Sequence, residues 1–246
     1  MSEVVFVGTS DAFGAGGRRQ SAILVRGPNG GTLLDCGTTT GSGLNALGIA
    51  RDEIDAIVVS HFHGDHFGGI PLLLLAAQYD DARTQPLRIA GPPSVEARVR
   101  ALAAAMGHPI EEHRWTFPIR FEELPTGRSL AFGPAHIASF ETYHSPNSAP
   151  HGLIVETGSA RIAYSGDTGW FDALPACVSG ADLFICECTY RSENDFEYHL
   201  NYETLSSQRS KFDCGRIVLT HLGQEMAAQR GRCALETADD GLKIRV

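Results

Sequence analysis

Three histidines and one aspartate lie within six consecutive positions, in the segment His61-Phe62-His63-Gly64-Asp65-His66. His61 and His63 are two residues apart, so in extended chain at the end of a strand their side chains project to the same side. After the turn at Gly64, Asp65 and His66 are adjacent and diverge, which suits two metal ions better than one. Imidazole and carboxylate ligands suit zinc, with manganese or iron as substitutes. The segment therefore predicts a dinuclear centre that could clamp a bridging water and polarise an oxygen of the substrate.

Three further residues of ligand type follow strands that we predict elsewhere in the chain. They are His144 after a strand over 137–142, Asp167 after a strand over 161–164, and His221 after a strand over 217–220. His61 follows the apolar run 57–59 in the same way. Ligands at strand ends converge on one edge of a sheet, where a rigid scaffold can hold reactive groups. We therefore expect these residues and the 61–66 segment to form one site.

The elements that must position these residues alternate between strands and helices. Strands are predicted over 4–7, 22–26 and 32–34, and the second and third are joined by a turn at 28–31. Helices are predicted over 70–77, from Ser94 as N-cap to about Met106, and over 202–212 after Asn201 as N-cap. The small and glycine-rich loop 8–14 is expected beside the active site.

The composition limits the class of protein. A chain of 246 residues with 43% hydrophobic residues can bury one sizeable core, so we expect a single domain over 1–246. The formal net charge of −9 disfavours broad binding to a nucleic-acid backbone. The six cysteines are scattered without a disulfide pattern, and no signal peptide or apolar run of ~20 residues is found. These features predict a cytoplasmic protein that does not enter a membrane.

The HxHxDH motif after a buried strand resembles the metallo-β-lactamase superfamily, and so does the earlier strand that ends in Asp35-Cys36-Gly37. The resemblance covers nearly the whole chain. It implies an αββα sandwich, in which two mixed β-sheets pack face to face with helices on the outside. It also implies that Asp35 braces a metal-binding histidine without binding an ion itself. The implied ligands are His61, His63 and His144 for the first ion and Asp65, His66 and His221 for the second, with Asp167 bridging both.

One branch of the superfamily is favoured by a strand with a glutamate, Glu187, that is followed by His199 at the head of a helix. This arrangement resembles ribonuclease Z-like proteins and implies that His199 is catalytic; Asp65 and His199 are our predicted catalytic residues. Only 22 residues separate His144 from Asp167, which leaves room for one hairpin. Enzymes that process tRNA carry a long arm there that grips the tRNA, so we expect tRNA not to be a substrate. A histidine at position 63, where the redox branch has a glutamate, also disfavours a di-iron oxygen reductase.

These observations predict a metal-dependent phosphodiesterase that acts on a small phosphodiester, such as a cyclic nucleotide or a cyclic sugar phosphate. A metal-bridging hydroxide would attack phosphorus, and His199 would aid departure of the leaving group. Two alternatives stay open. One is a hydrolase of a lactone, thioester or sulfate ester. The other is a carrier or cofactor-biosynthesis protein that resembles the pyrroloquinoline quinone pathway member of the superfamily.

Four histidines and two cysteines are not expected to bind metal. His151 is near enough to the site in sequence to contact substrate, and an exposed apolar helix face would permit a homodimer. Cys186 and Cys188 flank Glu187 and are predicted to be buried strand residues rather than ligands. The histidines left outside the metal site are His108, His113, His136 and His151.

Overall fold

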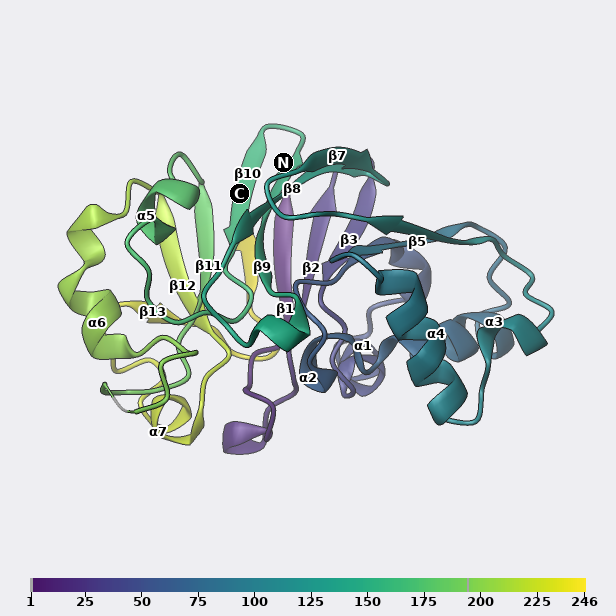
Figure 1. Ribbon diagram of the computed structural model, residues 1–246, viewed down its shortest axis with the longest axis horizontal. Helices are drawn as coiled ribbons and strands as arrows, with labels where there is room; N and C mark the ends of the chain where they lie inside the picture. The colour runs from purple at the N-terminus through teal and green to yellow at the C-terminus, as the bar shows by residue number, and fades with distance from the viewer. Residues whose placement is uncertain (1, 194) are drawn as a thin grey trace.

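The computed structural model describes residues 2–193 and 195–246. Within this part of the chain, two seven-stranded β-sheets lie at the centre and helices cover their outer faces (Figure 1). Each sheet contains both parallel and antiparallel pairs of strands. The αββα sandwich with two mixed sheets, predicted from the sequence, is therefore confirmed.

The first sheet contains the amino-terminal half of the chain and its last strand. Its strands, in spatial order, are β14 (Lys243–Arg245), β1 (Glu3–Gly8), β2 (Ala22–Gly27), β3 (Gly30–Leu34), β4 (Ile54–Val58), β5 (Leu87–Gly91) and β6 (Ile119–Glu123). The second sheet contains β13 (Glu236–Thr237), β12 (Arg216–Thr220), β11 (Leu183–Glu187), β10 (Ala160–Tyr164), β9 (His151–Thr157), β8 (Ala135–Glu141) and β7 (Ser129–Phe132).

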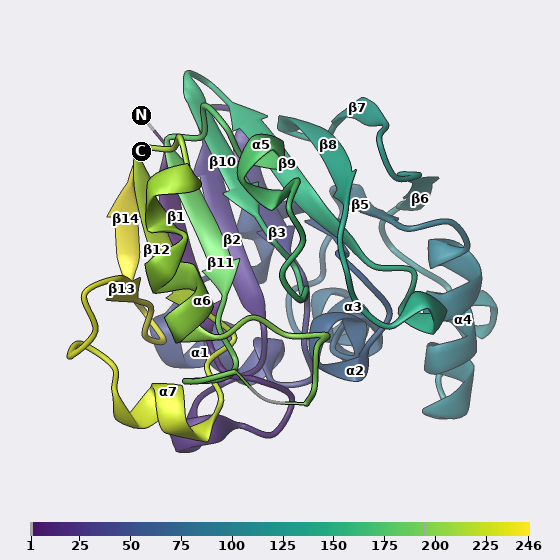
Figure 2. The ribbon, with the colours of Figure 1, turned by 60° about the vertical axis from the view of Figure 1, so that its left-hand side comes forward.

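The helices divide between the two outer faces. The α-helices are α1 (Thr40–Leu47), α2 (Gly64–Phe67), α3 (Ile70–Tyr79), α4 (Val95–Ala105), α5 (Leu174–Cys177), α6 (Tyr202–Ser207) and α7 (Gln224–Ala228). Short 3-10 turns are η1 (Ala15–Gly17), η2 (Arg51–Glu53), η3 (Ile110–Glu112), η4 (Pro146–Ser148) and η5 (Arg209–Lys211). Figure 2 shows α5 and α6 in front of the second sheet, with α1 and α3 on the far side of the molecule. Within the described residues, every helix falls short of the length and apolar character that a membrane-spanning helix requires.

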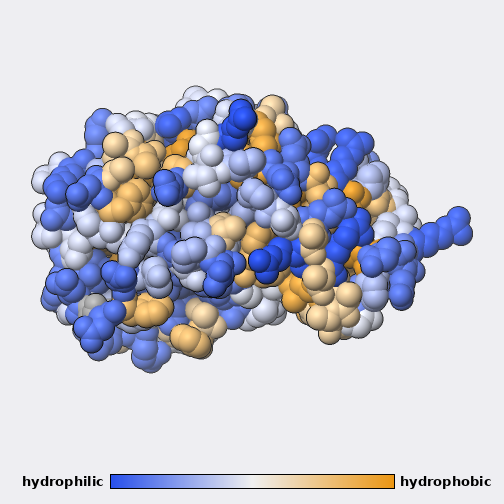
Figure 3. All heavy atoms as spheres, viewed as in Figure 1, coloured by the Kyte–Doolittle hydropathy of each residue, from blue (hydrophilic) through white to orange (hydrophobic). Residues whose placement is uncertain are grey.

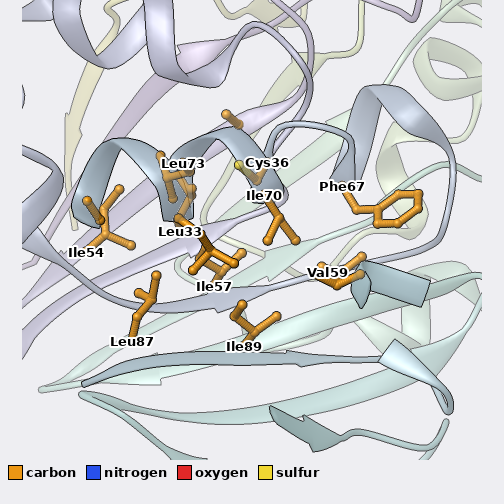
Figure 4. Close-up of a cluster of buried hydrophobic side chains, with 14 of the residues drawn as sticks. Leu33, Cys36, Ile54, Ile57, Val59, Phe67, Ile70, Leu73, Leu87 and Ile89 are labelled. Carbon is orange, nitrogen blue, oxygen red and sulfur yellow. The ribbon is translucent and has the colours of Figure 1, made fainter. Parts of the chain in front are cut away.

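Alternating side chains on the strands divide the interior into three apolar layers. Along β1, Val4 and Phe6 face the cluster between the two sheets, whereas Val5 and Val7 face the cluster under the helices. This two-residue period is what a strand buried on both faces requires. The outer cluster of the first sheet joins strand residues such as Leu33, Ile57 and Ile89 to Leu73 of α3 (Figure 4). A third cluster packs α5 and α6 against the outer face of the second sheet.

Two details of the helices differ from the sequence prediction. The predicted helix 202–212 ends at Ser207 and continues only as the 3-10 turn η5. Serine side chains compete with the helix for backbone hydrogen bonds, and Ser207 Oγ donates to the carbonyl of Thr204 at 2.9 Å. Ser94 does precede α4, but its side chain makes no capping bond; instead its N–H donates to Glu123 Oε1 at 2.7 Å.

Candidate metal centre

The predicted site residues come from the ends of four strands. β8 and β10 both pair antiparallel with β9, and β10, β11 and β12 run parallel, so β8, β10 and β12 end at the same edge of the second sheet. His144, Asp167 and His221 follow those three strands. The 61–66 segment follows β4 of the first sheet and continues into α2. The sandwich therefore brings both sheets' strand ends to one place.

The first group of potential ligands is His61, His63, His144 and Asp167. The Nε2 atom of His144 lies 3.1 Å from Nδ1 of His63, and Nε2 of His61 lies 3.6 Å from Oδ2 of Asp167. One ligand atom from each of the four residues lies within 4.8 Å of the others. Three imidazoles and a carboxylate at such distances are a donor set that suits zinc.

The second group is Asp65, His66, Asp167 and His221. The Nε2 atom of His66 lies 3.2 Å from Oδ2 of Asp65 and 3.3 Å from Oδ1 of Asp167. The Nε2 atom of His221 lies 3.3 Å from Oδ2 of Asp65 and 3.5 Å from Oδ2 of Asp167. Asp167 belongs to both groups, as a bridging carboxylate would. All seven residues predicted as ligands thus lie together, in the two sets that the superfamily resemblance implies; that they bind ions stays a prediction.

Unpaired buried atoms show that these residues fit metal ions. His61 Nε2, His66 Nε2 and Asp167 Oδ1 are buried and make no hydrogen bond, although His66 Nε2 and Asp167 Oδ1 lie 3.3 Å apart. A buried polar atom without a partner is costly, so proteins rarely leave one unless an ion or another group completes it. Three such atoms in one cluster indicate that the centre is built to hold cations.

Hydrogen bonds at Nδ1, on the side of the ring away from the cluster, orient several of the imidazoles. Asp35 Oδ2 lies 2.7 Å from Nδ1 of His66, as expected for the bracing residue, and Asp35 also accepts bonds from Ser60 and Tyr164. Ser60 Oγ lies 3.0 Å from Nδ1 of His61, and the carbonyl of Tyr198 lies 2.9 Å from Nδ1 of His144. Such partners fix the tautomer and turn Nε2 toward the centre of the cluster.

Burial and neighbouring charges together set the pKa values in the cluster. Burial lowers the pKa of His61 well below its usual value, which keeps its imidazole neutral and able to bind a cation. Burial acts to raise the pKa of Asp65, but the neighbouring His66 and His221 outweigh it and lower that pKa. Burial acts to lower the pKa of His66, and Asp167, Asp65 and Asp35 raise it well above its usual value. The carboxylates therefore stay ionised beside the histidines.

His199 lies beside this cluster and is held by Glu187. Nδ1 of His199 lies 2.8 Å from Oε1 of the buried Glu187 and 4.0 Å from Oδ2 of Asp167. The backbone N–H groups of Thr168 and Leu200 also donate to Glu187, so this carboxylate is fixed on both oxygens. Burial acts to lower the pKa of His199, but the charge and hydrogen bond of Glu187 outweigh it and raise the pKa to about 9. Glu187 therefore fixes the orientation of His199 and favours its protonated form.

A cavity of about 690 Å³ opens onto the cluster. Its floor includes His63, Asp65, Asp167 and His221, and its walls include the loop after β1 and the segment before α6. The loop 8–14 therefore lies beside the site, as expected. The aromatic residues Phe13, Tyr190 and Phe196 also line the cavity; no pattern in the sequence singled them out.

The other histidines considered in the sequence and the two cysteines that flank Glu187 lie outside the cluster of potential ligands. His151 is only 1% exposed and is not among the described residues that line the cavity, so it lies apart from the space in which we expect a substrate to bind. Its place as the first residue of β9, between neighbouring strands, explains the burial. Cys186 and Cys188 are buried and free, as predicted. Thr189 holds His221 in place, because its Oγ1 lies 2.8 Å from Nδ1 of that histidine. This role was not predicted from the sequence, although Thr189 follows Glu187 by only two residues.

Comparison with known proteins shows the family to which this chain belongs. The family described as "Anti-Pycsar protein Apyc1" matches residues 2–237. The chain belongs to the Apyc1 family. Among curated proteins, a ribonuclease Z of Mycobacterium sp. (strain KMS) is 28% identical over 276 aligned residues, which cover 100% of this chain and 96% of that protein.

Three solved structures share the fold along almost all of this chain. The metallo-β-lactamase fold protein YhfI of Bacillus subtilis is 22% identical, with a TM-score of 0.78 and 100% of each chain covered. A diphosphatase of the PhnP family is 15% identical, with a TM-score of 0.77, covering 100% of this chain and 98% of that one. Zinc-bound PqqB of Methylobacterium extorquens is 18% identical, with a TM-score of 0.75, covering 99% and 100%. This Apyc1-family chain thus has the metallo-β-lactamase fold and is similar in sequence to ribonuclease Z.

Proposed function

We propose that the protein hydrolyses a small phosphodiester, such as a cyclic nucleotide, with two divalent ions, of which zinc suits the ligands best. The observation that carries the proposal is the His199–Glu187 pair beside two ligand groups that share Asp167. Cleavage of a phosphodiester requires neutralisation of charge and an acid for a poor leaving group. This site has groups suited to both tasks.

Seven side chains of the cluster would hold the ions. Bound divalent ions supply Lewis acidity to the phosphoryl oxygens and activate water as a nucleophile. His61, His63 and His144 would hold one ion and Asp65, His66 and His221 the other, with Asp167 on both. Asp65 keeps its charge because the neighbouring histidines lower its pKa, so its carboxylate can accept a proton of the attacking water in a hydrogen bond and orient it.

His199 would protonate the leaving oxygen. The bond from Nδ1 to Glu187 leaves Nε2 to donate, and His199 lines the cavity. With a pKa of about 9, the imidazole carries its proton at neutral pH. A positioned acid of this kind contributes ~10²–10⁴ in rate. Alkoxide leaving groups depend on it most because they are the strongest bases.

The charges around the cavity favour a substrate with a single negative charge. None of the described residues that line the cavity is a lysine or an arginine, whereas Asp11, Glu193 and Glu225 are present. The ions and His199 would therefore be the cations that meet the substrate. One phosphodiester group carries one charge, but an oligonucleotide would bring many phosphates against an acidic rim. We therefore favour a small diester over tRNA.

A substrate panel tests the proposal. Protein loaded with zinc or manganese would be assayed on bis-p-nitrophenyl phosphate, a 3′,5′-cyclic nucleotide, a lactone and a thioester, with bound metal measured by elemental analysis. We expect about two ions per chain and turnover of the phosphodiesters. Turnover of the lactone or thioester alone, or metal content that saturates at one ion, would overturn the proposal. Fully loaded protein that hydrolyses none of these esters would point to a non-hydrolytic role.

His199→Ala provides a sharper test of the acid. We expect ~10²–10⁴-fold loss of rate on a diester with an alkoxide leaving group and a smaller loss with p-nitrophenolate, while the metal content stays unchanged. His108→Ala, at an exposed histidine outside the site, is the matched control. Equal losses on both substrates would remove His199 from the role of acid.

A further inference from the structure

An unusually exposed aromatic ring stands at the rim of the cavity. Phe13 is 94% exposed, yet it is among the residues that line the cavity above the metal cluster. Single exposed apolar side chains are common, but this ring borders the cavity, so its face is available to pack against a molecule bound there.

The loop that carries Phe13 is held by hydrogen bonds. Asp11 Oδ1 accepts the N–H groups of Phe13 at 3.1 Å and Ala15 at 3.2 Å. Gln20 Nε2 donates to the carbonyl of Ala12 at 2.9 Å. The glycines at 14, 16 and 17 have φ angles of 72°, 63° and 72°, which glycine adopts without strain. The exposure of Phe13 is therefore built into the loop and does not result from a lack of local contacts.

A second aromatic surface lines the same cavity on the segment before α6. Phe196 is 50% exposed, and its ring stacks on His199 with 5.6 Å between centroids and 26° between planes. Tyr190 meets the edge of Phe196 at 6.5 Å and also lines the cavity. Rings from two segments far apart in sequence thus border the space beside the proposed acid.

We propose that Phe13 and Phe196 form a subsite that receives the planar base of a nucleotide diester, which deepens the proposed function and rests on it. The phosphodiester must reach the floor of the cavity, where Asp65 and Asp167 lie. The cavity volume of about 690 Å³ leaves room for a nucleoside above that floor. Aromatic side chains stack on the face of any base, which gives affinity with little sequence preference. A sugar phosphate or another diester without a ring gains nothing from these two side chains.

The test compares two cyclic diesters on the metal-loaded protein. One is a 3′,5′-cyclic nucleotide, and the other is the cyclic phosphate of propane-1,3-diol, which has the same six-membered phosphodiester ring without a base. Phe13→Ala should lower kcat/KM for the nucleotide about tenfold, mainly through KM, and leave the baseless diester unchanged. Phe13→Tyr keeps a stacking face and should restore the wild-type ratio. Tyr79→Ala is the matched control, because Tyr79 is 66% exposed on α3 and does not line the cavity.

Binding measurements separate this subsite from the proposed reaction. A nucleoside 5′-monophosphate and ribose 5-phosphate would be titrated calorimetrically into wild type, Phe13→Ala and Phe196→Ala. If the wild type hydrolyses no diester, weaker binding of the nucleotide alone in the two variants still supports the subsite while the proposed function fails. Equal effects on the ligands with and without a base, or no effect on the nucleotide, would overturn the subsite even if diesters are hydrolysed.

Discussion

At the scale of single residues, the histidines that we propose as ligands differ in the nitrogen that faces the centre of the site. Four of them use Nδ1 for a hydrogen bond to a neighbouring group, which leaves Nε2 available to bind an ion; these are His61, His66, His144 and His221. His63 instead places Nδ1 3.1 Å from Nε2 of His144. Partners behind the ligands set the ring orientation and the basicity of the bound nitrogen. The strength of metal binding should therefore depend on residues that never touch an ion.

Asp35→Asn tests that dependence. Asparagine keeps the shape of the side chain and tolerates the left-handed backbone at this position, where φ is 59°. It removes the negative charge that faces Nδ1 of His66, so we expect ~10–100-fold weaker metal affinity. Competition with a chromophoric chelator would measure this change. Asp55→Asn, at a carboxylate that bonds the N–H of Gly31 instead of a ligand, should bind metal like the wild type. Wild-type affinity in Asp35→Asn would mean that Asp35 only shapes the turn.

Glu187→Gln tests the source of the raised pKa of His199. The proposed acid works in its protonated form, so activity is lost as the pH rises through its pKa, about 9 in the structure. Removal of the charge of Glu187 lowers that pKa, and the alkaline limb of kcat/KM should move to lower pH. A pH profile of kcat/KM would measure the shift, with Glu203→Gln on α6 as the control. An unmoved alkaline limb would assign it to another group.

At the scale of elements, the site depends on close contact between the backbone of Gly169 and the backbones of two neighbouring segments. A Cβ atom at Gly169 would lie 1.8 Å from the carbonyl of Glu197 and 2.9 Å from the ring of Tyr143. The N–H of Gly169 also donates to the carbonyl of Tyr143 at 2.7 Å. The loops after β8 and β10 and the segment before α6 are therefore packed backbone against backbone. This packing sets His199 relative to His144 and Asp167.

Gly169→Ala should displace the segment that carries His199. We expect a fall in kcat of ~10–100-fold, because small displacements of a positioned group are costly. The metal affinity should fall less than kcat, because this segment reaches the proposed ligands only through the carbonyl of Tyr198 at Nδ1 of His144. Steady-state kinetics with elemental analysis would measure both, and Gly41→Ala in α1, where an added Cβ meets nothing within 4 Å, is the control. Unchanged kcat would show that the segment can move without moving His199.

The same contacts explain what the sequence could and could not predict. The strand ends could be predicted because the two-residue period of buried side chains is a local property of the sequence. The HxHxDH segment could be recognised because its residues are neighbours in the chain. The burial of His151 and the aromatic lining by Phe13 and Phe196 depend on segments far apart in the chain. Glu187 was noted in the sequence, but its hydrogen bond to His199 follows from the path of the chain between them. Local patterns thus predicted which residues lie together at the strand ends better than they predicted the walls of the cavity.

At the scale of the whole molecule, charge and topology both disfavour a large polyanion. The net charge is −9, and in the face shown in Figure 3 hydrophilic groups dominate with small scattered apolar patches. Between His144 and Asp167 the chain forms only η4, β9 and β10, so no arm extends from this region. Binding of nucleic acid gains most of its affinity from basic groups that neutralise phosphates. None of the described residues that line the cavity is such a group.

A tRNA precursor should therefore be a poor substrate. Fluorescence anisotropy with a labelled precursor should give weak binding at both 50 and 200 mM salt, and removal of the 3′ trailer should be slow compared with turnover of a cyclic diester. Glu225→Lys adds a basic group at the rim of the cavity, where Glu225 is exposed, so it should strengthen RNA binding at low salt and make it more salt-dependent. Efficient trailer removal by the wild type at physiological salt would contradict the prediction. In that case the metal centre would act on RNA without the arm or the basic surface that such a polyanion requires, and the preference for a small diester would be wrong.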